Sequence, residues 1–449
     1  MSSTSINPSI FHAYDIRGIY PENFNKEAAY QIGRVFADYT KVKNVLIGRD
    51  MRLSSPEILK GLSQGLIEQG ADVFDAGLVP IDFIYSMVPK NNFNAGIMIT
   101  ASHDPKEYNG LKMILWQKKP WVEPISGELI KKLIDKNIKP AKKKGKIKKI
   151  NLWRKYLSHI FSFVDLKKIK PLKIVVDAGN GLAGKVIPLM AKKIPCRIIP
   201  LFFKLDGNFP NHPSNPFEKG AMDKLIKKVV KERADFGVFF DGDTDRIVLV
   251  DEKGEPLFGD FQLLLLAKKF LKEYPKSAVV YKVDQSRAVK ELIKKMGGKP
   301  IRTKVGYFYT AKAMRENKAI LGGETSCHFA FKDNFYADSG FIAFLIFLEI
   351  ISQSNKKLSE LVKEFKIYSK IHIPAIKVKN KEKVIEFLKR KHKNGKIDQL
   401  DGLTVEYNNW WFNLRPSNTE PVIRLTIEAK TNKLLKEKLS ELKKLIKNL

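Results

Sequence analysis

The stretch from Asn44 to Gln69, NVLIGRDMRLSSPEILKGLSQGLIEQ, contains the pattern that decides the fold class. It begins with a short apolar run that ends in Gly48-Arg49-Asp50, as expected of a buried strand followed by a turn. From Pro56 onwards, apolar side chains recur at helical spacing, which predicts an amphipathic helix. A strand, a turn and a helix in this order are typical of α/β layers with parallel strands.

Further copies of this unit follow along the chain. Lys173–Val176 runs into a glycine-rich turn, and Val279–Val283 precedes a helical period over Ala288–Lys295. After Lys366 the pattern changes to an alternating strand, a polar helix, another strand and an amphipathic terminal helix. We therefore expect a smaller α+β domain at the end of the chain.

Domain boundaries are expected where the composition changes. Lys139–Lys149 contains seven lysines and almost no large apolar residue, and Lys253-Gly254 is a turn after an apolar strand. The predicted domains are residues 1–150, 151–253, 254–366 and 367–449. The short polar link 367–370 is the expected hinge before the last domain.

Length and composition narrow the classes of protein. A chain of 449 residues has room for two to four domains, and its two distant cysteines, Cys196 and Cys327, exclude a disulfide framework or a cysteine zinc site. The longest apolar run, Phe341–Ile351, includes Glu349 and is too short to span a bilayer, so we expect a buried helix there. The sequence predicts a cytoplasmic protein without a membrane segment.

The charge raises nucleic acid as a partner, because 81 basic against 48 acidic residues give +33. The lysines are scattered through segments interpreted as helix-like, such as Lys131–Lys149 and Lys433–Lys447, with few aromatic residues between them. Proteins that bind single strands by stacking need such aromatic residues. We therefore favour solvated helix faces and attraction for a small anion, and consider nucleic-acid binding unlikely.

A serine follows an apolar strand in Thr100–Pro105. Ser102 is flanked by His103 and Asp104, with Lys112 downstream, so it could be a nucleophile or phosphate carrier exposed on a loop. An ordinary turn built on Asp-Pro and Asn-Gly explains the same residues equally well. Ser102 does not stand in the Gly-x-Ser-x-Gly pattern of a serine hydrolase, because its surroundings read Thr-Ala-Ser-His-Asp.

Three carboxylates occur in one tight turn between two apolar strands. Asp241, Asp243 and Asp245 can converge on one hard cation, and Mg²⁺ is the predicted ion, with a solvated acidic turn as the alternative. An EF-hand does not fit, because Arg246 stands where that loop needs glycine and strands flank the turn. Arg246 also suggests that a phosphate reaches the site.

A glycine-rich turn, Gly179–Lys185, matches two nucleotide-binding patterns. The next residue is Val186, however, so the hydroxyl that a P-loop places on Mg²⁺ is missing. We interpret it as a tight strand-to-helix turn, with nucleotide binding as the weaker alternative.

Two polar loops in the second half offer groups that could bind a ligand. In the loop Gly322–His328, Glu324 and Ser326 could bind sugar hydroxyls and His328 could transfer a proton; a structural role is the alternative. A phosphate cradle is predicted in the second loop, with a Pro-bounded turn as the alternative. Its residues are Arg415, Ser417, Asn418 and Thr419, with Arg424 nearby.

In this order, these loops resemble the signatures of the α-D-phosphohexomutase superfamily. They read TASHDPKEYNGLK (100–112), DGDTDR (241–246), GGETSCH (322–328) and RPSNTEP (415–421). The segments YDIRG (14–18) and DGNFPNHPSNP (206–216) match as well. The resemblance extends over nearly the whole chain.

The resemblance implies three successive mixed-sheet α/β three-layer domains and a smaller C-terminal α+β domain around a central cleft. In order, they would carry the phosphoserine, the metal, the sugar site and a phosphate site. It implies conversion between hexose 1-phosphate and hexose 6-phosphate, of mannose and/or glucose, through a phosphoserine and a hexose 1,6-bisphosphate intermediate that also activates the enzyme. The partner is a phosphosugar, and the chain would be a monomer or dimer. Phosphoglucosamine mutase is the alternative within the superfamily; a metal-dependent phosphatase and a basic nucleic-acid-binding protein are the alternatives outside it.

The resemblance also assigns roles to residues. Ser102 would carry the phosphoryl group and, with the three aspartates, hold Mg²⁺. The implied catalytic residues are Arg17, His103, Lys112, Arg246 and His328. The implied substrate-binding residues are Tyr14, Glu324, Ser326, Arg415, Ser417, Asn418, Thr419 and Arg424.

The sequence departs from the family pattern at a few positions. Cys327 replaces a glycine often found before the histidine of the sugar loop, and Tyr307 stands where a histidine is frequent. The lysine expected near Asp284 is displaced, and Lys282 is the candidate to replace it. These positions bear on which sugar is recognised.

Overall fold

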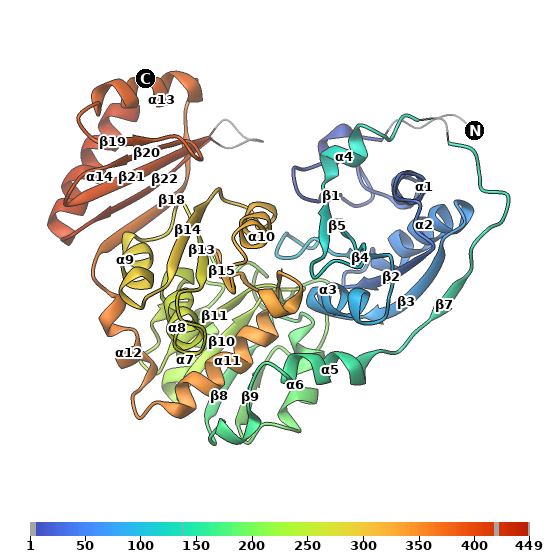
Figure 1. Cartoon of the computed structure of the whole chain (residues 1–449), viewed down its shortest axis with the longest axis horizontal. Helices are drawn as coiled ribbons and strands as arrows, with labels where there is room; N and C mark the ends of the chain where they lie inside the picture. Colours follow the sequence, from blue (N-terminus) through green and yellow to red (C-terminus); the bar gives the residue numbers. More distant parts are fainter. Residues whose placement is uncertain (1–5, 137, 417–421, 448–449) are drawn as a thin grey trace. The chain divides into compact units, whose positions relative to one another are not determined.

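The structure is a computed structural model that describes residues 6–136, 138–416 and 422–447. It divides into two compact units, Met1–Phe258 with Cys327–Ser359, and Gly259–Ser326 with Glu360–Leu449. Among the described helices, none combines the length and the apolar character that a membrane crossing requires. Figure 1 shows the elements of each unit along the chain.

The first sheet of the chain is mixed. Its order is β1-β5-β4-β2-β3-β7, with β6 beside β5. β2 runs parallel to β3 and β4, whereas β5 is antiparallel to β1 and β4. The strands are β1 (Ile16–Ile19), β2 (Asn44–Arg49), β3 (Asp72–Leu78), β4 (Ala95–Ile99), β5 (Tyr108–Leu115), β6 (Glu123–Ile125) and β7 (Ile147–Lys149).

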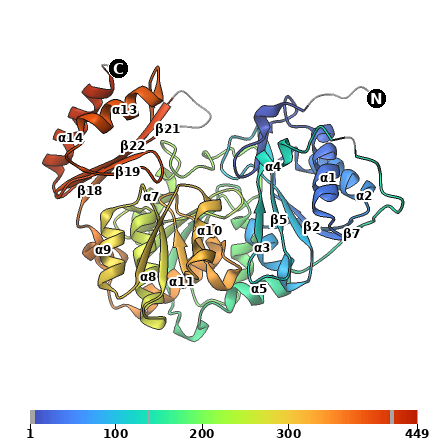
Figure 2. The same cartoon turned by 45° about the horizontal axis from the view of Figure 1, so that its top comes forward.

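Helices cover both faces of this sheet, because successive strand residues point to opposite sides. Val45 and Ile47 belong to the core that contains α1 and α2. On the other face, Gly48 and Gly96 leave room for Ile84 of α3, whose side chain lies where a Cβ would be (Figure 2). The helices are α1 (Lys26–Thr40), α2 (Ser55–Glu68), α3 (Ile81–Lys90) and α4 (Gly127–Lys131).

The lysine-rich segment Lys131–Lys149 was interpreted as helix-like, and this prediction is wrong. Helix α4 ends at Lys131, and Ile147–Lys149 forms strand β7, paired in parallel with β3. The segment has too few large apolar side chains to form a buried helical stripe. An edge strand, in contrast, needs only a neighbouring backbone and leaves its side chains in solvent. The prediction for Lys433–Lys447 is confirmed, since it lies in α14 (Asn432–Lys447).

The second sheet, β12-β11-β10-β8-β9, is also mixed and covered on both faces. On one face Gly237 makes room for Val229 of α7, and on the other Phe240 contacts Phe341 of α11. The predicted buried helix is thereby confirmed. The strands are β8 (Lys173–Asp177), β9 (Arg197–Leu201), β10 (Phe236–Phe240), β11 (Ile247–Asp251) and β12 (Pro256–Leu257). The helices are α5 (Trp153–Phe161), α6 (Ala183–Ala191), α7 (Asp223–Glu232) and α11 (Gly340–Gln353); the hairpin β16 (Phe329–Phe331) and β17 (Ala337–Asp338) precedes α11.

The second unit contains the parallel strands β14-β13-β15. Gly322 and Gly323 at the end of β15 make room for Met314 of α10 on one face and Leu263 of α8 on the other. The layered pattern therefore repeats. The elements are α8 (Gly259–Glu273), β13 (Ala278–Lys282), α9 (Arg287–Lys295), β14 (Lys299–Thr303), α10 (Tyr307–Glu316) and β15 (Leu321–Gly323). The short helix α12 (Leu358–Leu361) begins in the first unit and ends in the second.

The last part of the chain is an antiparallel sheet with helices, as predicted. Its order is β18-β22-β21-β20-β19, and Phe412 and Leu425 of the sheet share a core with Leu388 and Leu442 of the helices. At the expected hinge, Tyr368 donates to Glu291 and Lys370 pairs with Asp260. The elements are β18 (Ser369–Lys377), α13 (Lys381–Lys391), β19 (Lys396–Asp398), β20 (Leu403–Glu406), β21 (Trp410–Pro416), β22 (Val422–Ala429) and α14.

Candidate active site

Ser102 lies just after β4 and is buried, which corrects the prediction of an exposed loop position. It has a left-handed φ of 54°, and its N–H donates to Thr100 Oγ1 at 2.8 Å. The buried Arg52 guanidinium donates to the carbonyls of Ser102, Asp104 and Pro105 at 2.6–3.0 Å. Because one side chain draws these carbonyls together, the loop folds inward instead of extending into solvent.

The acidic turn between β10 and β11 brings its carboxylates together beside this serine. Oxygen atoms of Asp241, Asp243 and Asp245 lie within 4.8 Å of one another, and all three residues are buried. Ser102 Oγ donates to Asp241 Oδ2 at 3.3 Å, and Thr100 Oγ1 donates to Asp243 Oδ2 at 3.2 Å. The two predicted loops therefore form one cluster.

The charge of this cluster fits a hard divalent cation. Burial, followed by the negative charges of Asp245 and Asp243, raises the pKa of Asp241 well above its usual range. The buried Asp243 Oδ1 has no hydrogen-bond partner among the described residues. Oxygen donors of this kind match the ligand preference of Mg²⁺. Potential ligand atoms of a second group, Asp245, His328 and Asp338, also lie within 4.8 Å of one another.

Lys112 partly balances the acidic turn. Its Nζ lies 2.8 Å from Asp243 Oδ2 and 2.6 Å from Asp245 Oδ2. Burial opposes the charged form, but the two carboxylates outweigh it and raise the pKa of Lys112 above its usual value. For Asp245, burial likewise opposes ionisation, and Lys112 with His328 nevertheless holds the pKa well below its usual range. Lys112 is therefore held as an ammonium, which neutralises negative charge in the cluster.

Two histidines and an arginine complete the cluster. His103 Nδ1 lies 3.4 Å from Ser102 Oγ, and burial, with the charges of Arg246 and Arg17, lowers the pKa of His103 well below its usual value. His103 is thus neutral at pH 7. His328 Nε2 lies 3.2 Å from Asp245 Oδ1 and 3.3 Å from Arg246 Nε. Arg246 Nη2 lies 3.4 Å from His103 Nε2, so it joins the two rings.

Arg17 connects β1 to the serine loop. Its guanidinium pairs with Asp15 at 2.8 Å and Asp104 at 3.0 Å, and donates to the Ala101 carbonyl at 3.3 Å. Burial opposes its charge, but the two aspartates raise the pKa of Arg17 above its usual value. Tyr14, three residues earlier, is 37% exposed and so is accessible to a ligand.

In the second unit, the predicted sugar loop presents a compensated carboxylate. Glu324 is buried at the end of β15 and pairs with Lys282 at the end of β13. Thr310 Oγ1 donates to Glu324 Oε1 at 3.1 Å, and Ser326 Oγ donates to Oε2 at 3.0 Å. Lys282, the candidate replacement for the displaced lysine, therefore orients Glu324. Cys327 has a left-handed φ of 66°, a conformation that glycine adopts without strain.

The predicted phosphate cradle is described in part. Arg415 of β21 and Arg424 of β22 are register partners in the antiparallel pair, so both belong to one end of the sheet. Arg415 Nε lies 3.9 Å from Asp401 Oδ2. Ser417, Asn418 and Thr419 lie outside the described residues. On the neighbouring strand His372 Nδ1 lies 2.9 Å from Thr426 Oγ1, a polar group that the sequence interpretation did not include.

Family models match the chain in four consecutive segments. Phosphoglucomutase/phosphomannomutase alpha/beta/alpha domains I, II and III match residues 8–140, 154–254 and 258–368, and the C-terminal domain matches residues 375–445. The chain belongs to the phosphoglucomutase/phosphomannomutase family. Membership confirms the resemblance to the phosphohexomutase superfamily and the four-domain α/β fold.

Named relatives support this assignment over nearly the full length. The chain is 35% identical to a phosphomannomutase of Escherichia coli K12, covering 94% of each chain. It is 36% identical to a phosphomannomutase/phosphoglucomutase of Pseudomonas aeruginosa, covering 98% of this chain and 95% of the relative. A crystal structure of a family protein from Burkholderia thailandensis matches with a TM-score of 0.88 and 31% identity, covering 99% of this chain and 98% of that one.

Two supporting features of this family member were not identified from the sequence as parts of the site. Arg52 holds the serine loop; the local sign is its place two residues after Gly48-Arg49-Asp50, beyond the carboxyl end of β2. The glycine-rich turn before α6 connects a strand to a helix and also packs against the acidic turn, because a Cβ on Gly181 would lie 2.9 Å from Gly242. That glycine therefore permits close packing behind the carboxylates.

Proposed function

We propose that this chain is a Mg²⁺-dependent phosphohexomutase in which Ser102 carries the transferred phosphoryl group. The family supports a hexose phosphate mutase, an isomerase. The observation that carries the residue assignment is the Ser102 hydroxyl, which contacts the acidic turn at Asp241 and lies beside the neutral His103. An ordinary turn does not require a buried serine whose hydroxyl contacts one member of a cluster of three carboxylates.

The chain's own residues account for most of the proposed step. The phosphorus–oxygen bond to Ser102 breaks as a bond to a hexose phosphate hydroxyl forms; the hydroxyl proton passes to a basic group of the cluster, and the departing Ser102 oxygen takes up a proton to become the hydroxyl again. Arg17, Lys112 and Arg246 neutralise the phosphoryl oxygens, and His103 Nδ1 can hold a proton next to Ser102 Oγ. Held by Asp241, Asp243, Asp245 and Ser102, Mg²⁺ would supply further neutralisation of charge on the transferred group.

The remaining groups are assigned to the substrate. Glu324 would accept hydrogen bonds from ring hydroxyls of the sugar, and Ser326 would donate to them. Arg415 and Arg424, with residues 417–419, would bind the phosphate that is not transferred. The hexose 1,6-bisphosphate would turn round between two transfers and act as activator.

We propose four domains, residues 1–150, 151–253, 254–366 and 367–449. In this order they would carry the phosphoserine, the metal, the sugar loop and the phosphate loop.

The assignment of Ser102 is tested by intact mass and peptide mapping of the active enzyme. Phosphate should be found on Ser102, and Ser102→Ala should abolish turnover without changing the fold. Ser214→Ala is the matched control, because Ser214 is also buried beside the acidic turn, near Gly242. Full mutase turnover of Ser102→Ala would show that the serine is not the carrier.

The sugar preference is proposed from charge. Once Mg²⁺ offsets the carboxylates of the acidic turn, the cations Lys112, Arg17 and Arg246 would disfavour a C2 ammonium by like-charge repulsion, so glucosamine phosphate should be the poorest substrate. Mannose and glucose differ only in one hydroxyl orientation, which without a dedicated partner changes transition-state binding by about 1–3 kcal/mol. A comparison of kcat/KM for the three 1-phosphates tests this. A preference for glucosamine phosphate would favour the amino-sugar mutase.

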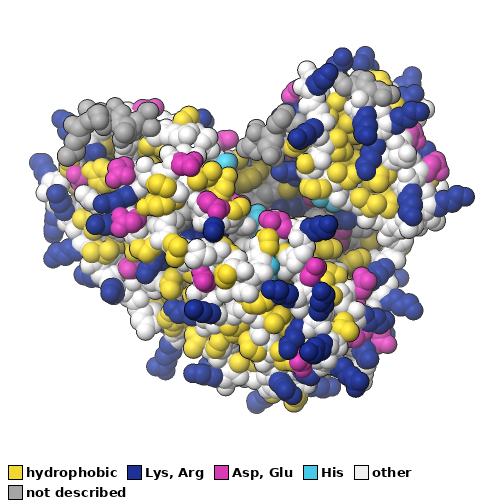
Figure 3. Space-filling view, turned by 180° about the vertical axis from the view of Figure 1, so that it is seen from behind, with side chains coloured by type: hydrophobic (Ala, Val, Ile, Leu, Met, Phe, Trp, Pro, Cys, Tyr) yellow, Lys and Arg dark blue, Asp and Glu magenta, His cyan; other side chains and the backbone are white. Residues whose placement is uncertain are grey.

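The other classes are separated by simple assays. A phosphatase would release inorganic phosphate and need no hexose bisphosphate for steady turnover. A nucleic-acid-binding protein would associate with DNA in a steeply salt-dependent way, unaffected by hexose phosphates. On the face drawn in Figure 3, Lys and Arg side chains are spread among acidic and apolar ones, as for solvated surface charge.

A further inference from the structure

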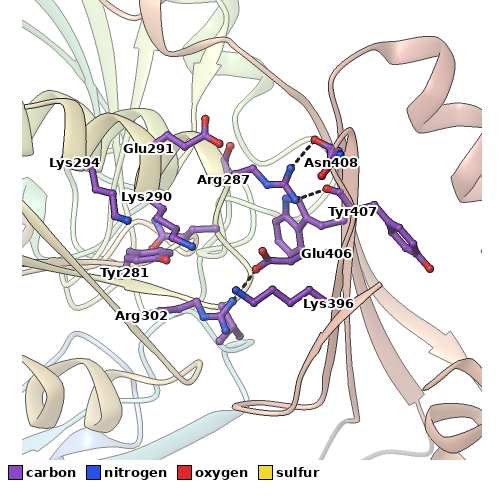
Figure 4. A pocket seen from close by; sticks show the side chains of 14 residues that line it. Tyr281, Arg287, Lys290, Glu291, Lys294, Arg302, Lys396, Glu406, Tyr407 and Asn408 are labelled. Atoms are coloured by element: carbon purple, nitrogen blue, oxygen red, sulfur yellow. Dashed lines mark hydrogen bonds and ion pairs between the residues drawn. The ribbon is translucent and has the colours of Figure 1, made fainter. Parts of the chain in front are cut away.

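A pocket of about 390 Å³ lies within the second unit. One wall is formed by β13, β14 and α9, and the other by the strands β19, β20 and β21 of the C-terminal sheet (Figure 4). The residues assigned above to catalysis and substrate binding do not line this pocket. Its volume is typical of sites for small molecules.

The lining carries an excess of positive charge. Five basic and two acidic side chains contribute to it, a net charge of +3. Of the acids, Glu406 is already paired with Arg302 at 3.3 Å, and Glu291 accepts a hydrogen bond from Tyr368 at 2.8 Å. Arg302 pairs with Asp398 as well. With Arg302 neutralised by these two acids, Glu291 is the one remaining acid of the lining and faces four cations, Arg287, Lys290, Lys294 and Lys396.

The remaining cations are placed on both walls. Arg287 at the start of α9 donates to the carbonyls of Asn408 at 3.1 Å and Tyr407 at 2.9 Å, which are neutral acceptors. Lys290 of α9 and Lys396 of β19 extend towards the centre from opposite walls (Figure 4). An anion between these two lysines would neutralise charge from both walls at once.

Tyr281 adds a hydroxyl donor to the lining. Burial raises its pKa to about 12, so this hydroxyl is protonated at neutral pH. The arginine and lysine side chains also offer donors and no acceptors. The ligand that matches such a site is rich in acceptors, small and multiply charged, which describes a phosphorylated compound better than a neutral sugar.

We propose that this pocket is a second anion site, which binds a small phosphorylated molecule carrying at least two negative charges. Because its cations come from both walls, the bound anion links α9 to the C-terminal sheet and stabilises the second unit. The inference is independent of the mutase activity proposed above, and its test does not measure turnover.

The test uses the full chain and pyrophosphate as the probe, with binding followed by calorimetry. The pocket variant is Lys290→Ala/Lys396→Ala. Its matched control is Lys295→Ala/Lys393→Ala, two exposed lysines from α9 and the segment before β19 that do not line the pocket. Both variants lose the same charge, so they change the long-range attraction for anions equally. Equal unfolding midpoints without ligand would establish that both are folded.

We expect the pocket variant to weaken one pyrophosphate binding event by at least about tenfold and the control by less than about twofold. Pyrophosphate should also raise the unfolding midpoint of wild type and control more than that of the pocket variant. Equal losses in both variants would assign the binding to general surface charge, and unchanged binding in both would assign it to another site. Either result, or no binding to wild type at millimolar pyrophosphate, overturns the proposal. Equally tight binding of citrate would overturn the assignment to phosphate.

Discussion

Two buried acidic sites of this protein differ in how their charge is balanced. In the acidic turn, Asp241, Asp243 and Asp245 are crowded together. Lys112 contacts two of them and Arg246 Nε lies 3.6 Å from Asp241 Oδ2, so two cations face three carboxylates. In the sugar loop, Glu324 stands alone against Lys282, with Thr310 and Ser326 donating to its two oxygens. The first site has surplus negative charge, and the second is neutral.

This difference separates the chemical capacities of the two sites. A buried cluster with surplus negative charge gains by binding a cation. A buried ion pair has no such need, but its oriented carboxylate can accept hydrogen bonds from neutral hydroxyls. Burial of a carboxylate alone therefore does not identify a metal site; the balance of charge around it does.

The largest effect is expected at the acidic turn. Asp241→Asn should lower kcat by about a thousandfold, because it removes a charge that would hold the proposed cation and that contacts Ser102. In chelator, however, the same variant should unfold at a higher temperature than wild type, since it relieves repulsion between buried carboxylates. Thermal unfolding with and without Mg²⁺ measures this. An unfolding midpoint of Asp241→Asn below that of wild type in chelator would show that the negative charge of the turn is balanced without a metal.

The ion pair of the sugar loop should respond in the opposite direction. Glu324→Gln leaves the buried Lys282 ammonium without its counter-charge and should lower the free energy of unfolding by about 3 kcal/mol. Glu316→Gln, an exposed glutamate on α10, is the control and should change it little. Adding Lys282→Met to Glu324→Gln should recover part of the loss in denaturant titrations. A Glu324→Gln variant as stable as the Glu316→Gln control would show that the charges of Glu324 and Lys282 do not depend on each other.

A third buried acid, Asp82, sharpens the comparison, because neutral hydroxyls are its side-chain donors. Tyr156 donates to it at 2.8 Å, and Ser339 donates as well. Burial raises the pKa of Asp82 to about 7 from its usual 3.8. Between these values the native state binds a proton that the unfolded state has released. Stability should therefore fall as pH rises from about 4 to 7, by up to about 1.4 kcal/mol per pH unit, and level off above.

Asp82→Asn has no such proton to lose and serves as the comparison. Denaturant titrations of both proteins at pH 5 and pH 8 should show wild type losing more stability than the variant. Parallel pH profiles of wild type and Asp82→Asn would show that burial does not raise the pKa of Asp82.

Local sequence predicts the acidic turn well, because the three aspartates lie within five residues of one tight turn and their carboxylates are therefore close together. The layered fold is predictable for a similar reason, since strand, turn and helix signals are local. The burial of Ser102 is not, because Arg52 acts from another strand end. The pairing of Lys282 with Glu324 depends on β13 lying beside β15 in the sheet, and this strand order has no local signal in the sequence. Lys131–Lys149 misled the interpretation because lysine is compatible with a helix, whereas the missing apolar stripe excludes one.

Strand β7 has a consequence for the behaviour of the protein at high concentration. It occupies the edge of the first sheet, where unpaired backbone groups could recruit a strand from another molecule. Its three residues are exposed, and two of them, Lys148 and Lys149, carry positive charge. A second copy approaching this edge would have to bring like charges together and desolvate them. The lysines of β7 thereby protect the sheet against edge-to-edge aggregation.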